Sequence, residues 1–235
     1  MYKRQIPNIT DGELSGEVLI NGEDIKGKRL GEVCRKVGVV LQNADEQIIQ
    51  KTVEDEIAFG CENLAFSPEK ISKQIDTVCR LMKLDKSWQS RKLSGGQKRR
   101  VAIAGVIVTK PEILVLDEPA AGLDPLGKEE IAALLKKVHS DWCKTVIVVS
   151  HDMDEIAESC DRAAVFSDGK IAFCDTPEKL FTQDAEALFS LGLDIPVTAK
   201  ISRALAAEGI VAPSDLTEKG FVNAVAEQFA ADRTA

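Results

Sequence analysis

The sequence is poor in the residues from which metal centres and disulfide frameworks are built. Its 235 residues include only two histidines, His139 and His151, and six cysteines that form no C-x-x-C pair. Structural zinc sites need four cysteine or histidine ligands at short spacings, so the sequence argues against a zinc centre. Scattered thiols indicate free cysteines in a reducing compartment. The six are Cys34, Cys61, Cys79, Cys143, Cys160 and Cys174.

Long apolar runs and an excess of positive charge are also missing. No stretch approaches the roughly 20 apolar residues of a membrane span, and no charged-then-apolar signal peptide opens the chain. We therefore expect any contact with a membrane to come through a partner. The formal net charge of −8 argues against a nucleic-acid surface. One basic cluster, Lys98-Arg99-Arg100, has the composition of a solvated helix face.

The apolar pattern that is present belongs to the α/β class. Residues 113–116 and 145–149 are continuous apolar runs rich in β-branched side chains, which predicts strands buried on both faces. Residues 37–41 and 162–166 form two further predicted strands. Alternating strands and helices of this kind predict a parallel sheet.

The rest of the chain predicts a hairpin, a helical region and an appendage. Residues 16–22 form a strand that closes in an Asn-Gly turn, a hairpin signal. Ser67-Pro68 supplies a cap and a first-position proline for a helix in the region that follows. We divide the chain into a main domain, residues 1–183, and a small helical appendage, residues 184–235.

Two adjacent carboxylates, Asp117 and Glu118, end the apolar strand in ILVLDEP (113–119). In an open α/β sheet, ligands bind at the carboxyl edge of the strands. There the first carboxylate is well placed for Mg²⁺, and the second for orienting or deprotonating a water. A solvated acidic turn is the plain alternative. His151 and Gln42 also follow predicted strands, so they are expected at the same edge.

The stretch LSGGQ (93–97) precedes a helix that is expected to begin near Lys98. Its Ser94, Gly95 and Gly96 can aim backbone N–H groups and the positive end of the helix dipole at an anion. An ordinary glycine-rich turn with a serine cap is the alternative.

Together and in this order, LSGGQ, ILVLDEP, AGLD (121–124) and Ser150-His151 resemble the ATP-binding cassette (ABC) ATPases over about residues 15–175. The resemblance implies a P-loop NTPase-type, RecA-like parallel sheet core. It also implies the family's helical subdomain at about 43–100 and a cofactor pair of ATP and Mg²⁺.

Three further stretches are similar to the ATPase subunits of energy-coupling factor importers, which take up vitamins or metal ions. They are VLQNADEQ (40–47), EDEIAFG (54–60) and LGLDIP (191–196). Two positions depart from the family pattern. Leu41 replaces an aromatic residue that often precedes the glutamine, and Ala120-Ala121 replaces a pair that usually contains Ser or Thr.

The resemblance implies roles for the residues at the sheet edge. Asp117 would organise Mg²⁺, and Glu118 would polarise the attacking water. His151 would contact the γ-phosphate of ATP. Gln42 would sense the metal and the water while linking to the membrane partner.

The resemblance also implies partners. The signature residues, Ser94, Gly95, Gly96 and Gln97, would grip the ATP held by a second ATPase subunit, in a homo- or heterodimer. Asp124 would lie at that interface. A transmembrane coupling subunit and a substrate-binding membrane subunit would complete the importer, with this chain peripheral at the cytoplasmic face of the cell membrane and no nucleic-acid partner.

The stretch GEDIKGKR (22–29) comes within one residue of the phosphate-loop pattern G-x-x-x-x-G-K-[ST], whose last hydroxyl holds Mg²⁺. Arg29 takes that last place, and Glu23 and Asp24 would set two negative charges against phosphates. We interpret the likeness as a coincidence. No other stretch of the sequence has the pattern, so we expect a chain that lacks its amino-terminal segment, or else a naturally degenerate subunit.

The leading hypothesis is an ATP-binding and ATP-hydrolysing subunit that energises an importer. The alternatives are an ATPase subunit of another ABC transporter class, and a non-catalytic, degenerate cassette that acts as a regulatory or dimer partner. Intact Asp117, Glu118 and His151 argue against the degenerate cassette. A cassette ATPase of DNA repair would need a long coiled-coil insertion, and one of translation typically a second cassette; the sequence has neither.

The 235-residue chain by itself should show no ATPase activity. Each charge-assisted hydrogen bond from a phosphate loop contributes about 1.5–3 kcal/mol, so lacking several lowers ATP affinity by many orders of magnitude. A phosphate-release assay of the purified chain with Mg²⁺ and ATP checks this. Steady hydrolysis that persists after contaminating ATPases are removed would contradict it, and Lys28→Ala would then be the first variant to make.

Overall fold

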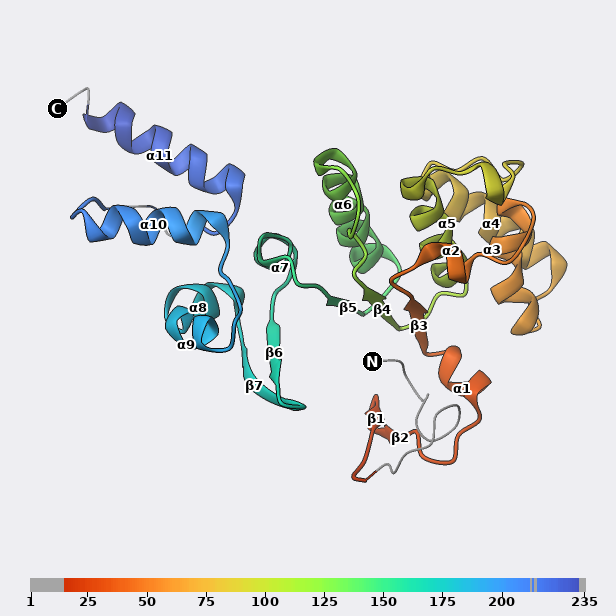
Figure 1. Ribbon diagram of the computed structural model, residues 1–235. Helices are drawn as coiled ribbons and strands as arrows, with labels where there is room; N and C mark the ends of the chain where they lie inside the picture. The colour runs from red at the N-terminus through yellow and green to blue at the C-terminus, as the bar shows by residue number, and fades with distance from the viewer. Residues whose placement is uncertain (1–14, 212, 214, 233–235) are drawn as a thin grey trace.

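The parallel sheet that the sequence predicts lies at the centre of the molecule (Figure 1). The computed structural model describes residues 15–211, 213 and 215–232. The strands of the sheet, in spatial order, are β3 (Val37–Val40), β4 (Ile113–Asp117) and β5 (Thr145–Val149). Both pairings are parallel, and Leu116 lies between Val40 and Val148. The middle strand, β4, is therefore fixed from both sides.

A group of helices packs beside β3 and forms the first hydrophobic core. Its members are α2 (Ala44–Gln47), α3 (Val53–Asn63), α4 (Pro68–Met82), a short 3₁₀ helix (Ser90–Lys92) and α5 (Gly95–Ile107). The predicted cap of α4 is confirmed, since the Ser67 side chain accepts the N–H of Lys70 at 3.4 Å. The central helix is α5, which contacts β3 and the other three α-helices. Its Val101, Ile103 and Ile107 are fully buried.

The predicted hairpin is confirmed ahead of α1 (Leu30–Cys34). β1 (Leu19–Ile20) pairs antiparallel with β2 (Glu23–Asp24). Lys28, in the stretch that resembles a phosphate loop, forms an ion pair with Glu23, which also accepts from Lys36 at 2.9 Å. The hydrogen bonds from Lys28 and Lys36 lower the pKa of Glu23 to about 2. Because Lys28 binds a carboxylate of its own loop, the likeness to a phosphate loop is best explained as coincidental.

Two expectations about the later strands are wrong. β6 (Ala163–Ser167) does not extend the parallel sheet; it pairs antiparallel with β7 (Lys170–Asp175). β5 is not buried on both faces, since Ile147 is 46% exposed and Val149 48% exposed. Within the described part of the chain β5 hydrogen-bonds to β4 alone, so β6 does not continue the sheet beyond it. Side chains of β5 alternate between exposed and partly buried, so one face of the strand is left uncovered.

The carboxyl-terminal helices lie on the far side of the molecule from α2–α5 (Figure 1). They are α8 (Pro177–Thr182), α9 (Ala185–Ser190), α10 (Val197–Ala207) and α11 (Glu218–Asp232). Their own core is built on Leu180, Phe181 and Leu188. Side chains of α7 (Met153–Ser159) and of the β6–β7 hairpin pack against that core. The domain boundary expected at residue 184 stays a prediction.

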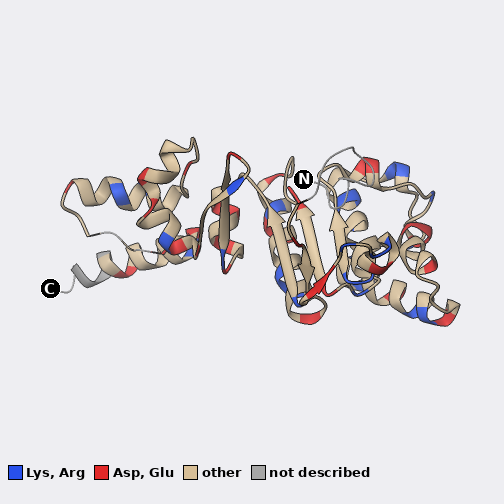
Figure 2. Cartoon of the chain, turned by 90° about the horizontal axis from the view of Figure 1, so that it is seen from below, with Lys and Arg blue, Asp and Glu red and all other residues tan. Residues whose placement is uncertain are grey.

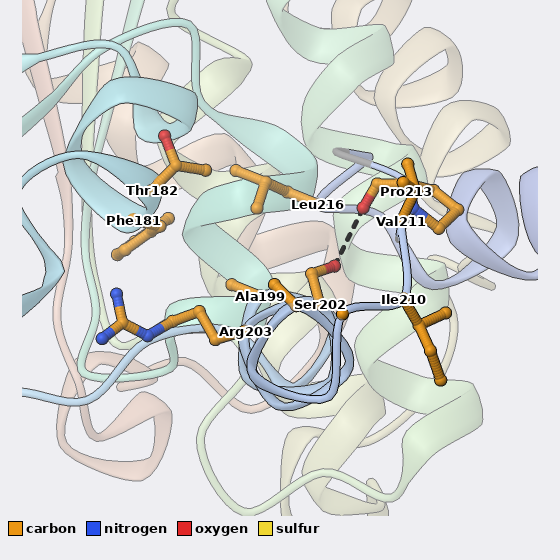
Figure 3. Close-up of a pocket in the computed structure, with 11 residues that line it drawn as sticks. Phe181, Thr182, Ala199, Ser202, Arg203, Ile210, Val211, Pro213 and Leu216 are labelled. Atoms are coloured by element: carbon orange, nitrogen blue, oxygen red, sulfur yellow. Dashed lines mark hydrogen bonds between the residues drawn. The ribbon is translucent and has the colours of Figure 1, made fainter.

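A pocket of about 510 Å³ lies between α8, α10 and the segment before α11 (Figure 3). Phe181, Ala199 and Leu216 contribute apolar walls. Arg203, which also lines the pocket, forms an ion pair with Glu186. The pocket belongs to the second core and lies apart from the parallel sheet.

Charged residues surround the parallel sheet rather than cross it. Figure 2 shows its three strands free of Lys, Arg, Asp and Glu along most of their length, with charges on the surrounding helices and loops.

α6 (Pro125–Asp141) connects β4 to β5 and buries Ile131 and Val138. In the ranges that the structure describes, no helix combines the length and apolar character needed to cross a membrane.

Gly38→Ala should destabilise the protein. A β-carbon on Gly38 would lie 2.4 Å from Cγ1 of Val106 and 3.0 Å from Cγ of Pro111. Overpacking of this kind costs about 1–3 kcal/mol, measurable as a lower midpoint in urea. Gly31→Ala is the matched control, because the space around Gly31 is open and alanine favours the helix there. An unchanged midpoint for Gly38→Ala would contradict the close approach of β3 to α5.

Candidate functional site

The carboxyl ends of the parallel strands place four of the predicted residues at one edge of the sheet. Asp117 is the last residue of β4 and lies opposite Val149, the last residue of β5. Glu118 follows β4 directly, His151 follows β5 by two residues, and Gln42 follows β3 by two residues. Parallel pairing thus brings together side chains that are far apart in the sequence.

Glu118 has an unusual backbone conformation. Its φ is 49°, in the left-handed region that residues with a β-carbon rarely adopt. Its N–H donates to the carbonyl of Val149 at 2.8 Å, which ties the residue to the end of β5. Backbone strain of this kind is concentrated at functional sites, because the surrounding structure must hold it in place. Here the strained turn aims the carboxylate toward the segment after β5.

The Glu118 carboxylate meets the imidazole of His151. Nδ1 of His151 lies 2.6 Å from Oε1 of Glu118. The Glu118 side chain is 15% exposed, whereas the His151 ring is 83% exposed. The hydrogen bond to Glu118 and its negative charge raise the pKa of His151 above its ordinary value of 6.5. The pair therefore favours the imidazolium, which can donate from both ring nitrogens.

A second set of polar side chains shapes the turn around His151, and the sequence reasoning missed it. Asp152 caps α7 by accepting the N–H groups of Asp154 and Glu155, each at 3.2 Å, and it accepts Nζ of Lys128 at 2.7 Å. Ser150 accepts the N–H of Asp152 at 3.1 Å and donates to the carboxylate of Glu155. Burial raises the pKa of Glu155. An Asp directly before an apolar residue that begins a helix, here Met153, is a capping signal that could have revealed Asp152.

The signature stretch lies at the amino end of α5, which begins at Gly95 rather than near Lys98. Ser94 is its cap: Ser94 Oγ accepts the N–H of Gln97 at 3.3 Å, and Oε1 of Gln97 accepts the N–H of Ser94 at 2.8 Å. This reciprocal pair is a capping box, which fixes the first turn. A β-carbon built on Gly96 would lie 3.9 Å from Leu123, so the AGLD turn of the same chain is nearby.

Asp124 also has a structural role within the chain. Its carboxylate accepts the N–H of Gly127 at 2.8 Å and caps α6. Its expected place at a dimer interface remains a prediction.

The basic cluster Lys98-Arg99-Arg100 is not a solvated helix face, and that expectation is wrong. Lys98 forms an ion pair with Asp45. Arg99 is 6% exposed, and its Nη1 donates to the carbonyl of Leu41 at 2.9 Å. Arg100 pairs with Glu130 at 2.8 Å. The three side chains leave α5 in different directions, so each contacts a different element. The composition of the cluster does not reveal these contacts.

Two side chains at this edge carry oxygen atoms that could bind a divalent cation, namely the carboxylate of Asp117 and the amide of Gln42. Mg²⁺ in nucleotide sites usually takes one or two protein oxygens and completes its shell with phosphate oxygens and water. Asp117 and Gln42 fit that pattern. The described residues hold no group of three or more His, Cys, Asp or Glu side chains that could bind a metal.

Comparison with known proteins agrees with this geometry. The family model for ABC transporters matches residues 7–121. The energy-coupling factor transporter ATP-binding protein EcfA1 of Caldanaerobacter subterraneus is 41% identical over 204 residues, which is 86% of this chain and 73% of that protein. The chain belongs to the ABC transporter family. It is an ATP hydrolase by family, of the energy-coupling factor group.

Two further relatives support the assignment to this ABC group. EcfA1 of Streptococcus pyogenes serotype M12 is 41% identical over 214 residues, or 89% of this chain and 75% of that protein. The solved structure of cbiO1 from Clostridium perfringens, described as part of the ABC transporter complex cbiONQ, has a TM-score of 0.68 at 32% identity. It covers 80% of this chain, and the match covers 76% of cbiO1. The family fold is therefore present.

Replacing Glu118 by Gln should lower the pKa of His151 in this ABC ATPase, because the substitution removes the negative charge beside the imidazole. NMR titration of the two imidazoles would measure this, with His139 on α6 as the control signal. Since the folded-state pKa is raised, the stabilising pair is fully formed below the unfolded value near 6.5 and is lost as pH rises through the folded value. An identical His151 titration in the Gln variant would show that the contact is absent in solution.

Proposed function

We propose that the chain is the ATP-binding and ATP-hydrolysing subunit that energises an importer of the energy-coupling factor type, for vitamins or metal ions. The observation that carries the proposal is the 2.6 Å contact between Glu118 and His151, beside Asp117, at the carboxyl edge of the parallel sheet. The names of the relatives, which are transporter ATP-binding proteins, support the transport setting.

Hydrolysis of the γ-phosphate requires a water held in line and donors for the charge on the phosphate oxygens. Glu118 can accept a hydrogen bond from that water through the carboxylate oxygen that does not bind His151. The imidazolium of His151, favoured by its raised pKa, donates Nδ1–H to Glu118 and leaves Nε2–H for a phosphate oxygen. One residue thus orients the water while its neighbour binds the group under attack.

Mg²⁺ bound with ATP would neutralise charge on the phosphate oxygens. Asp117 and Gln42 are the residues that would hold it. Gln42 can lose or gain this contact without a change of charge, because its side chain is a neutral amide. That property suits a residue that also links the site to a membrane subunit.

A second ATPase subunit would complete the site. Ser94, Gly95, Gly96 and Gln97 form a preorganised helix start that suits an anion. We propose that they bind the ATP of the partner subunit and that Asp124 lies near this interface. Together with a coupling subunit and a substrate-binding subunit in the membrane, the dimer would place the chain at the cytoplasmic face, peripheral to the bilayer.

The experiment that tests the proposal adds a phosphate loop to the chain. A chain extended at its amino end by a strand and a G-x-x-x-x-G-K-[ST] loop should hydrolyse ATP in a Mg²⁺-dependent way. Glu118→Gln in that chain should lower kcat about 10²- to 10⁴-fold while nucleotide binding persists, because only the water-orienting carboxylate is lost. Phosphate release and fluorescent-nucleotide titration give the two quantities.

Glu178→Gln is the matched control, since Glu178 lies in the first turn of α8, in the second core region. It should leave kcat unchanged. Equal turnover by Glu118→Gln would rule out the role given to Glu118. Nucleotide binding without any turnover in the parent extended chain would favour the non-catalytic alternative.

A further inference from the structure

Leu41, the residue before Gln42, is held through its backbone by two side chains. Its N–H donates to Oε1 of Gln47 at 3.0 Å. Its carbonyl accepts Nη1 of Arg99 at 2.9 Å. β3 ends at Val40, so Leu41 is the point at which the chain leaves the sheet. The direction in which Gln42 leaves the sheet is therefore set by these two side-chain contacts.

Arg99 is buried to a degree that arginine seldom reaches unless it has a partner. It is 6% exposed, and its guanidinium lies within the electrostatic reach of Asp117. Burial lowers its pKa, and the negative charge of Asp117 opposes that shift. One side chain from the helical group thus binds the start of the Gln42 loop and lies near enough to the acidic strand end for the charge of Asp117 to act on it.

The same helix carries the signature. Arg99 is the fifth residue of α5, just over one turn after Gly95. α5 is anchored by the fully buried Val101 and Ile103, and Ser94 caps its start. A helix so packed moves as one body, so a displacement of the signature also displaces the guanidinium of Arg99.

The rest of the Gln42 loop is attached to the helical group as well. Lys98 pairs with Asp45. The buried carboxylate of Glu56, on α3, accepts the N–H groups of Ile49 at 2.9 Å and Gln50 at 2.7 Å. Residues 41–50 therefore follow α3 and α5, while Asp117 and Glu118 belong to the sheet.

We propose that Arg99 is a positioning residue that clamps Leu41 to the signature helix, so that the position of LSGGQ sets the position of Gln42 in the same chain. The roles of LSGGQ and Gln42 rest on the proposed function; the clamp itself rests on the two Leu41 contacts. In this proposal Arg99 acts through Leu41 and is not a catalytic residue.

Amide hydrogen exchange of the 235-residue chain tests the clamp without nucleotide or turnover. Arg99→Met keeps the volume and removes the donors, and should raise exchange in peptides covering 41–43 by on the order of 10-fold, the value of a hydrogen bond to a charged donor. Arg99→Lys, which keeps a charge and a donor, should restore part of the protection. Arg100→Met is the matched control on the same helix, since Arg100 pairs with Glu130 instead.

A double-mutant cycle separates positioning from general support. Ser94→Ala removes the cap of the signature helix and should raise exchange at 41–43 in the parent chain. In the Arg99→Met background, Ser94→Ala should cause no further increase in exchange at 41–43, because Arg99 no longer links Leu41 to α5. Additive effects of the two substitutions would overturn the proposal, as would equal effects of Arg99→Met and Arg100→Met.

Gln47→Met keeps the test decisive if Arg99→Met unfolds the chain. It removes the other contact to Leu41 and leaves the buried charge in place, and it should raise exchange at 41–43 while peptides of β4 stay protected. Unchanged exchange in Gln47→Met and Arg99→Lys would overturn the clamp. Because exchange needs no ATP, failure of the clamp and failure of the proposed ATPase activity give different results.

Discussion

The parallel pairing of β4 with both of its neighbours is the constraint on which the candidate site depends. The ladder on one side places Leu116 beside Val40, and the ladder on the other places Asp117 beside Val149. Side chains alternate between the faces of a strand, so a slip of one residue would turn Asp117 to the opposite face. Such a slip would also expose Leu114 and Leu116, which are fully buried. Burial of apolar residues thus sets the place of the acidic pair.

Two carboxylates near the sheet edge have a direct partner. Glu118 meets His151 and Asp152 meets Lys128, while the charge of Asp117 acts on the buried guanidinium of Arg99 without a direct ion pair among the described contacts. A cluster of unpaired carboxylates would repel the phosphates of a nucleotide. The two direct partners reduce the net negative charge at the edge, which suits the nucleotide site proposed above. The left-handed turn at Glu118 belongs to the same arrangement, because from this turn the Glu118 carboxylate contacts His151.

The helical group and the sheet meet through few, well-defined contacts near the site. Arg99 crosses from α5 to Leu41, and Gly38 allows β3 to approach Val106 of α5 closely. The first contact is one hydrogen bond, and the second is a close steric fit. A hydrogen bond to a charged donor and a close-packed interface both resist displacement. The two contacts therefore tie β3 and the start of the Gln42 loop to the same helix, α5.

The sequence by itself determined features that depend on a few neighbouring residues or on a short motif. Several features follow from short-range chemistry and from the apolar pattern of the strands. They are the turn at Asn21-Gly22, the cap at Ser67, the strands at 113–116 and 145–149, and the placement of Asp117, Glu118 and His151 at strand ends. The tertiary structure decided the rest. Whether β5 is covered, whether β6 joins the sheet and whether Arg99 faces water all depend on which elements lie beside them in space. Apolar periodicity shows that a side chain prefers burial, but the neighbour that provides it is chosen by the packing of the whole chain.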